Sequence, residues 1–363
     1  MQEYLKMKRF FYEAFGVEEC QTDAMEKALW EWFRLYYGKN LLALPYTIGR
    51  KMQRAVFAEC EAQGDAGALE AVRLGLENAM LAGEAYLKPC RFEGGFRWVG
   101  IPRNRILIFA RDHQGRPTDV GLMEQTRDGR ERFTLLERRI RDQEGRLLIC
   151  NRLFRSRNAG ELGREIPLET RYPELLGRFT YEGIPGVGLV GMKMPMINCV
   201  DGSPDGVSIF AAAARLIRAA EENEEQLRRE FRNGASRLVV SRDLLREGQL
   251  QDDLFVALDE APESVGITVF SPQLRQESFL ARQQSYLRAI ENVVGLKRGL
   301  LSQVEAVDRT ATEITSSEGE YMTTVLELRR VAQWGLTDAA ALAAALDGTE
   351  FTAPTVSWGD NVV

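Results

Sequence analysis

Apolar side chains in residues 1 to about 90 recur at intervals of three and four, the spacing of one helix face. Three helices are predicted here. The first has Thr22 or Asp23 as its N-cap and ends at Gly38. The second begins after Pro45, and the third covers "GALEAVRLGLENAMLAGEAYL". An aromatic cluster on the first helix is interpreted as core or subunit contact rather than a ligand cage: Trp30, Trp32, Phe33, Tyr36 and Tyr37.

From about residue 96 to residue 153 the apolar period changes to two, which is typical of half-buried strands. The strand-like stretches are "FRWVGI", "RILIFA", "TDVGLMEQT", "RFTLLERRI" and "RLLICNRLF". Because short turn sequences separate them, the pattern predicts an antiparallel meander. Its charged positions are expected to form a solvated face, although a face so rich in arginine also suits an acidic partner. These positions are Arg130, Arg132, Glu137, Arg139 and Arg141.

The stretch "GVGLVG", Gly186 to Gly191, fits the G-x-G-x-x-G template of a dinucleotide-binding loop. Such a loop needs a buried strand before it and a helix that opens at its third glycine. Here Pro185 falls where the strand should end, and Pro195 together with "DGSP" opposes a helix afterwards. An irregular connection with tight turns is therefore the favoured interpretation.

A long amphipathic helix is predicted next, with Ser203 or Ser208 as possible N-caps and Gly234 as its end. Its narrow apolar face and charged face suit packing among like helices in an assembly, and they suit an ordinary surface helix equally well. The apolar face comprises Phe210, Ala213, Ile217, Ala220, Leu227 and Phe231.

A small module and two more helices complete the chain. In the module "SRLVVS" and "VGITVF" are predicted strands, and "DLLREGQLQDDLFVALDEAP" between them is predicted to be loop or short helix. The second long helix lies in "PQLRQESFLARQQSYLRAIENVVGL", and "KRGLLSQVEAVD" breaks it. The third begins at a capping box of Thr310 and Glu313 and is expected to stop near Gly335 or Leu336. An extended tail is predicted after it.

Composition removes several classes of function. The chain has 363 residues, 45% of them apolar, and a net charge of −6 from 47 basic and 53 acidic residues. This is not the basic footprint of a dedicated DNA-binding domain. No run of about 18 apolar residues exists, so no transmembrane helix is predicted. The charged start is unlike a secretory signal, so we expect a cytosolic chain at synthesis.

The residues that usually carry catalysis or hold metals are sparse. Five scattered cysteines form no C-x-x-C pair, which argues against a disulfide framework and a zinc site. The only histidine, His113, lies in a turn sequence, which excludes most hydrolase and metalloenzyme mechanisms. The carboxylates around residues 252–260 lack further ligands at suitable spacing and are interpreted as solvated. We therefore expect no catalytic residues, no metal and no cofactor.

The C-terminal half resembles tailed-phage portal proteins of the branch found in long-tailed phages of Gram-positive bacteria. The segments that carry the resemblance are "NCVDGSPDGVSIFAAAARLI", "FRNGASRLVVSRDLL", "VDRTATEITSSEGEYMTTV" and "TVSWGDNVV". It covers about residues 100 to 363. It implies an α+β, mainly helical portal fold, with long stem and wing helices, an antiparallel β meander in the wing and a small α/β clip. Because little chain remains after the third long helix, the crown is expected to be reduced or absent.

The resemblance also divides the chain. It implies an N-terminal helical part of the wing (1–95), a β-rich wing and connection (96–200), a stem helix (201–235), a clip (236–272) and a second stem helix (273–295). A tunnel loop (296–310), a long wing helix (311–346) and an extended tail (347–363) follow.

In that family, a ring of about twelve subunits at the capsid vertex passes double-stranded DNA in and out, independently of its sequence. The implied partners are the large terminase subunit, the head–tail adaptor, the major capsid and scaffold proteins, and no membrane. The protein is expected in the virion, and in the host cytoplasm during assembly. The residues implied to contact DNA are Lys297, Arg298, Gln303 and Arg309. Those implied to dock partners at the clip are Arg242, Arg246, Asp252, Asp253, Asp259 and Glu260.

Alternatives remain open at this point. Lys297 and Arg298 also suit a role as cations at the C-terminal end of the preceding helix. The chain could be another head–tail connector or tail ring component of a phage or phage-derived particle. A nucleotide-binding enzyme that uses Gly186–Gly191 is the less favoured alternative.

Overall fold

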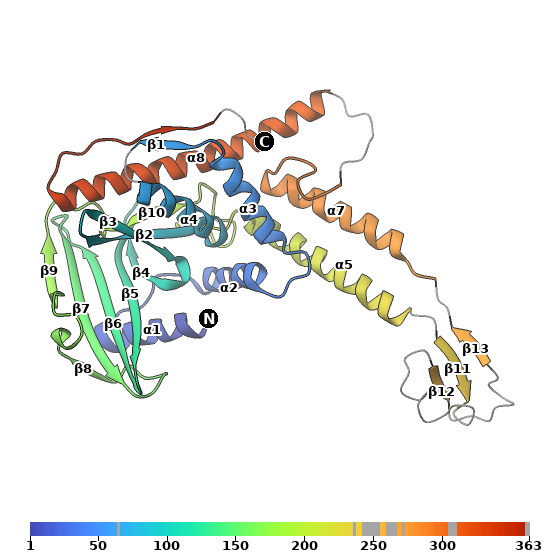
Figure 1. Ribbon diagram of the computed structural model, residues 1–363, viewed down its shortest axis with the longest axis horizontal. Helices are drawn as coiled ribbons and strands as arrows, with labels where there is room; N and C mark the ends of the chain where they lie inside the picture. The colour runs from blue at the N-terminus through green and yellow to red at the C-terminus, as the bar shows by residue number, and fades with distance from the viewer. Residues whose placement is uncertain are drawn as a thin grey trace.

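The computed structural model describes residues 1–63, 66–234, 237–241, 255–258, 267–270, 273–303 and 311–359. Figure 1 shows a broad body from which two long helices extend side by side as a stalk, with a small group of strands at the far end. The body holds the N-terminal helices, the larger sheets and the longest helix, which crosses one side of it.

Three N-terminal helices were predicted and the described residues form four, since Gln2–Phe15 is an additional one; only Asp23–Tyr37 has both of its predicted ends. The four are α1 (Gln2–Phe15), α2 (Asp23–Tyr37), α3 (Leu44–Val56) and α4 (Ala66–Ala82). The Thr22 hydroxyl accepts a hydrogen bond of 3.2 Å from the Met25 backbone N–H, which confirms the N-cap of α2. The prediction that α4 continues through "EAYL" was wrong. Gly83 turns the chain at φ 84°, where an added Cβ would lie 2.2 Å from the Gly206 backbone.

A three-stranded sheet begins directly after that turn. Its order is β10 (Val190–Lys193), β2 (Glu84–Phe92) and β3 (Gly95–Pro102), and all neighbours are antiparallel. The sheet packs against α4 and α8, so it joins the N-terminal helices to the C-terminal part of the body. A two-stranded sheet pairs β1 (Glu61–Gln63) with β14 (Thr355–Ser357).

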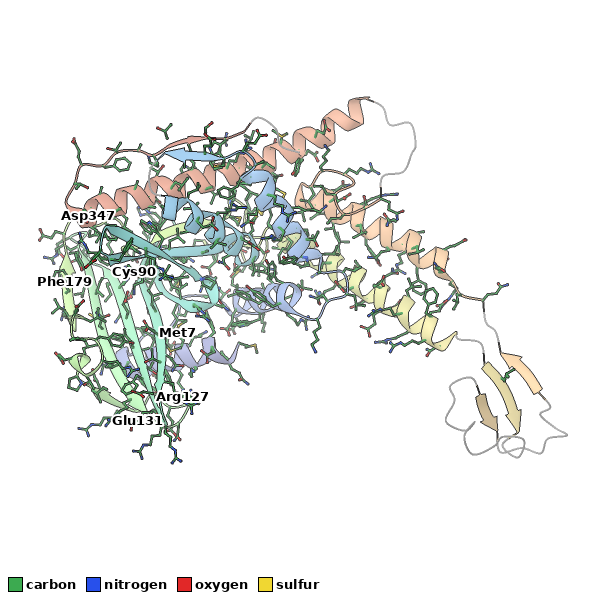
Figure 2. The ribbon with its side chains drawn as sticks, viewed as in Figure 1. Met7, Cys90, Arg127, Glu131, Phe179 and Asp347 are labelled. Atoms are coloured by element: carbon green, nitrogen blue, oxygen red, sulfur yellow. The ribbon has the colours of Figure 1, made fainter. Side chains whose placement is uncertain are left out.

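The largest sheet confirms four of the five predicted meander strands, whereas the first, "FRWVGI", forms β3 of the three-stranded sheet. It comprises β4 (Ile106–Arg111), β5 (Pro117–Asp128), β6 (Glu131–Arg141), β7 (Leu147–Ser156), β8 (Arg164–Ile166) and β9 (Arg178–Tyr181). Helix α1 covers part of it, because its buried Phe10 and Phe11 share a core with Leu107, Leu136 and Phe154. Figure 2 shows Arg127 and Glu131 at the outer tip of the β5–β6 hairpin, far from Asp347 at the end of the longest helix.

The prediction of a solvated charged face is right at Arg130 and Arg141 and wrong at Glu137 and Arg139, which are 8% and 6% exposed. The Glu137 carboxylate lies 2.5 Å from Lys88 Nζ and 2.5 Å from Arg139 Nε. Burial disfavours the charged carboxylate, but Arg139 and Lys88 outweigh it and hold the pKa of Glu137 at about 2. The region 184–193 covers this part of the sheet, which the local pattern could not reveal.

The stalk consists of α5 (Ala214–Asn233), which leads away from the body, and α7 (Gln276–Val294), which returns to it. Gly234 ends α5 as predicted. The start of α5 differs, because a 3-10 turn at Ala211–Ala213 precedes it and the fully buried Ser208 hydroxyl donates to the Met80 carbonyl instead of capping.

The β module at the far end of the stalk has the order β12 (Phe255–Leu258), β11 (Arg237–Ser241), β13 (Ile267–Phe270). Strands β11 and β13 are antiparallel and confirm the two predicted strands. Strand β12 pairs with β11 in parallel and lies in a stretch that was predicted to be loop or short helix. A single short apolar run set among carboxylates carries too little pattern to distinguish a strand from a short helix.

Helix α8 (Ala311–Asp347) runs past the end that the local pattern predicted and is close to the range 311–346 that the resemblance implied. The expected stop at Gly335 or Leu336 was wrong, because both residues are buried inside the helix. An added Cβ at Gly335 would lie 3.3 Å from the Met192 side chain, so this glycine lets β10 approach closely rather than ending the helix. The helix ends before Gly348, which has φ 65°.

The fold class therefore needs correction. Across the described residues fourteen strands form four sheets, the largest with six strands, beside seven α-helices. The molecule is α+β, and the prediction of a mainly helical portal fold was wrong. The strands of the body, β2 to β10, all fall between Glu84 and Lys193, where the predicted fold placed only a meander within a helical wing.

Candidate functional site

The segment that follows α7 is held in place by one buried carboxylate. Glu291 on α7 is fully buried, and its Oε1 accepts backbone N–H groups from Gly299, Leu301 and Ser302 at 3.1, 2.6 and 2.8 Å. Its Oε2 accepts the Ser302 hydroxyl at 2.7 Å. A buried ionised group is tolerated only when its lone pairs are satisfied in this way. The fold of residues 295–303 is thus centred on Glu291, and we call this segment the anchored loop.

Two further contacts fix the anchored loop to neighbouring helices. Lys51 Nζ on α3 donates to the Leu300 carbonyl at 2.7 Å, and the Gln303 N–H donates to Gln284 Oε1 on α7 at 2.7 Å. Gly295 begins the loop in the left-handed conformation at φ 73°. The base of the loop is therefore braced from both helices before the chain reaches α8.

The sequence-predicted DNA-contact residues meet different surroundings. The Lys297 ammonium forms an ion pair of 3.2 Å with Glu318 on α8, with both side chains about half exposed, so a phosphate would have to compete with Glu318. Arg298 is exposed. Gln303 is exposed, and its backbone takes part in the loop's attachment. Arg309 lies outside the described residues, as do the six predicted clip-docking residues: Arg242, Arg246, Asp252, Asp253, Asp259 and Glu260.

A buried polar pair fixes the two stalk helices against each other. Asn223 on α5 donates its side-chain N–H to Gln283 Oε1 on α7 at 2.8 Å and to the Phe279 carbonyl at 3.1 Å. Near the tip, Arg275 forms an ion pair with Glu230 at 2.6 Å. A buried amide pair in an apolar interface favours one register of the two helices.

The outer surface of α5 carries exposed basic and acidic side chains close to one another. Glu225 and Arg229 form an ion pair of 2.8 Å one turn apart along α5. Their exposed neighbours Arg215, Glu222, Arg228 and Arg232 have both signs as well. This surface can meet another charged surface, and it presents no continuous basic track for a phosphate backbone.

Few signals in the sequence pointed to Glu291, Asn223 and Gln283. Asn223 occupies a position between Ala220 and Leu227 on the predicted apolar face, and this polar residue among apolar ones was the only signal. Glu291 lies beside Ile290 one turn before Gly295, where a carboxylate on an apolar face could have been recognised as an anchor.

The glycine motif does not form a dinucleotide loop. Gly186 and Gly188 turn the chain at φ 56° and 67°, and strand β10 follows instead of a helix. The loop carbonyls of Val187 and Gly188 accept hydrogen bonds from Arg139 at 3.2 and 2.8 Å. A cavity of about 410 Å³ lies beside the loop and is lined in part by Gly186, Arg141 and Asp338. The helix N-terminus that would bind pyrophosphate is missing from this stretch.

No group of three or more His, Cys, Asp or Glu side chains suited to a metal ion occurs among the residues that the structure describes. All five cysteines are free thiols, and His113 lies in the tight β4–β5 turn. In the described ranges, every helix is too short or too polar to cross a bilayer.

Comparison of the sequence with protein-family models and with curated proteins gives no match. Function is therefore inferred from the residues and the geometry described above.

Proposed function

We propose that this chain is one subunit of a phage portal ring, the channel through which double-stranded DNA enters and leaves the capsid. The supporting observation is the stalk. Helix α5 leads away from the body, the β module lies at its far end, and α7 leads back to the anchored loop. Copies arranged around an axis would form a tube wall from the stalks, with the modules at one rim. A tube of this kind can form from subunits whose bodies are not mainly helical.

The electrostatics of the described residues suits a channel along which DNA slides. Each phosphate contact that a protein makes deepens the energy minimum in which DNA rests. The chain has a net charge of −6, and Lys297 in the anchored loop is neutralised by Glu318. A tube lined in this way would hold DNA weakly and without regard to sequence.

The proposed partners are those that the resemblance to portal proteins implies. In the proposed ring of about twelve subunits, the module at the stalk tip meets the large terminase subunit during packaging and the head–tail adaptor afterwards. The body faces the major capsid and scaffold proteins. The protein acts in the virion and assembles in the host cytoplasm, without a membrane, a cofactor or a catalytic step.

A second candidate comes from the same class: another head–tail connector or tail ring component. The stalk with its terminal module also suits such a ring. The two differ in the partner that the module binds, since only a portal meets a terminase. The nucleotide-binding enzyme is less well supported, because strand β10 occupies the place of the required helix.

The test is the native mass of the purified protein by light scattering, with negative-stain images of the same fraction. Closed rings of about twelve copies around a central hole would support the proposal. Binding of the large terminase subunit to the rings, lost after deletion of residues 236–272, would separate a portal from a tail component. A monomer or dimer across salt and protein concentrations would contradict both ring functions. A thermal-shift panel of nucleotides and divalent metals tests the enzyme alternative in the same preparation.

A further inference from the structure

The outward face of α2 lines a cleft that the proposed ring function does not use. Its volume is about 780 Å³, and it also contacts the short 3-10 turn before β4. Lys27, Trp30, Arg34 and Tyr37 contribute from α2 at steps of three and four, so they share one side of the helix. Asn104 contributes from the turn.

Aromatic rings form one wall of the cleft. Trp30 lies 5.8 Å from Phe33 between ring centroids, and Phe33 stacks on Tyr37 at 5.9 Å with an interplanar angle of 8°. Trp30 also meets the Tyr4 ring of α1 edge-on at 5.3 Å. Phe33 is nearly buried, whereas Tyr37 is 66% exposed, so the ring series runs from the core to the surface. A flat apolar side chain can extend this series.

Three buried polar atoms of the cleft residues have no hydrogen-bond partner in the described part of the protein. Glu31 Oε1 has a cation beside it, 3.0 Å away. The other two are Trp30 Nε1, which can only donate, and Asn104 Oδ1, which can only accept. Leaving such atoms without a partner costs about 1–3 kcal/mol each, so their presence requires an explanation. One donor and one acceptor together complement a peptide group, whose C=O accepts and whose N–H donates.

The cleft also carries uncompensated positive charge. Lys27 and Arg34 are both exposed, and neither side chain forms an ion pair or hydrogen bond with another described residue. The cleft carboxylate, Glu31, is already matched by Arg218 of α5, with 3.0 Å between Oε1 and Nε in a geometry that is not a hydrogen bond. The charge that remains for a ligand is therefore that of two cations.

We propose that this cleft binds an extended peptide segment of a partner protein, in which a carboxylate side chain neighbours an aromatic or large aliphatic one. The apolar side chain packs on Trp30 and Tyr37, and the peptide group bonds Trp30 Nε1 and Asn104 Oδ1. The carboxylate lies between Lys27 and Arg34 and gains charge-assisted hydrogen bonds. The inference is independent of the proposed ring.

The test measures the binding of two fluorescent peptides to the full-length protein by anisotropy. The first probe is acetyl-Gly-Glu-Phe-Gly-amide with a dye on a C-terminal linker, and the second has Lys in place of Glu. The first should bind saturably and at least about tenfold tighter than the second, as expected for a charge-assisted contact. Three variants are compared: Lys27→Glu with Arg34→Glu, Trp30→Phe, and Arg130→Glu as a matched charge reversal on the distant β5–β6 hairpin.

The double charge reversal should weaken the acidic peptide about tenfold or more and reduce or invert the preference over the basic one. Trp30→Phe keeps a ring but removes the N–H, and it should weaken both peptides several-fold. Arg130→Glu should leave both affinities unchanged. Because Lys27 and Arg34 are exposed, the melting temperature of the double variant should stay within about 2 °C. Equal affinity for both peptides, or equal loss in Arg130→Glu, would overturn the proposal.

Discussion

The side-chain N–H of Asn223 on α5 meets Gln283 Oε1 on α7 at 2.8 Å, inside the interface of the stalk, where both residues are buried. The same Asn223 amide also reaches the Phe279 carbonyl. The contact joins the outgoing and the returning helix near the middle of each, so it fixes how far one can slide past the other.

Asn223→Ala should destabilise the stalk by about 1–3 kcal/mol, because it leaves the buried Gln283 Oε1 without its partner. Chemical denaturation followed by helix content measures the loss. Glu222→Ala, at the exposed neighbouring position, is the matched control and should change the free energy of unfolding by less than about 0.5 kcal/mol. An equal effect of the two changes would rule out the register role of Asn223.

Glu291→Ala should release the anchored loop, since three backbone N–H groups and the Ser302 hydroxyl lose one common acceptor. Hydrogen exchange at Gly299, Leu301 and Ser302 should accelerate by at least about tenfold, the equivalent of roughly 1.4 kcal/mol. Glu291→Gln keeps one side-chain oxygen for the same amides and should cause a smaller acceleration. Unchanged exchange in the alanine variant would show that the loop is held by other contacts.

The ion pairs of Glu137 predict how stability falls in acid. Its pKa lies at about 2 in the folded protein and near 4.5 in the unfolded chain. A lowered pKa in the folded state stabilises the protein above the unfolded value, and this contribution is lost as the pH falls from about 4.5 toward 2. Glu137→Gln should lower stability at pH 7 by up to about 3 kcal/mol and flatten the pH dependence between those values. Urea denaturation of both proteins between pH 7 and 2.5 checks this, and parallel pH profiles would contradict it.

Gly186 and Gly188, two glycines of the G-x-G-x-x-G sequence, provide a matched pair of substitutions. Gly188 has φ 67°, and an added Cβ would lie 2.7 Å from Leu147, whereas Gly186 has φ 56° and open space around it. Gly188→Ala should therefore lower the melting temperature by several degrees more than Gly186→Ala, which suffers backbone strain of about 1 kcal/mol alone. Differential scanning fluorimetry with and without ATP or NAD also tests the enzyme alternative. A nucleotide-dependent rise that Gly186→Ala abolishes would favour it over the ring.

Local signals predicted much of the body, and long-range packing decided the rest. Thr22 and Gly38 bound α2 as expected because a cap is satisfied by its own helix. The predictions failed where a segment distant in the sequence packs against the residue in question. Gly335 was interpreted as a helix end, but β10 packs against it, and Arg139 was interpreted as solvated, but the loop at Val187 covers it.

The candidate site was less predictable than the fold. The resemblance directed attention to the polar and charged residues at 297, 298, 303 and 309, yet the described part of that segment is shaped by Glu291 on α7. A buried carboxylate and an exposed one look alike in a sequence, since only the folded chain determines which backbone amides surround it. The cleft on α2 was missed for a related reason. Its cluster of aromatic residues was interpreted as core or subunit contact; Trp32 and Phe33 belong to the core, whereas Tyr37 is exposed and lies outside it.

The pairing of β1 with β14 bears on how the protein emerges from the ribosome. Glu61 aligns with Ser357, so the two strands are separated by about 300 residues of chain, a contact that forms late in folding. Until residues 355–357 have been synthesised, β1 keeps an unpaired edge while the helices around it are already present. Ribosome stalling or proteolytic loss near residue 350 would therefore leave a chain with an intact stalk and an open strand edge. Such an edge favours aggregation over orderly assembly.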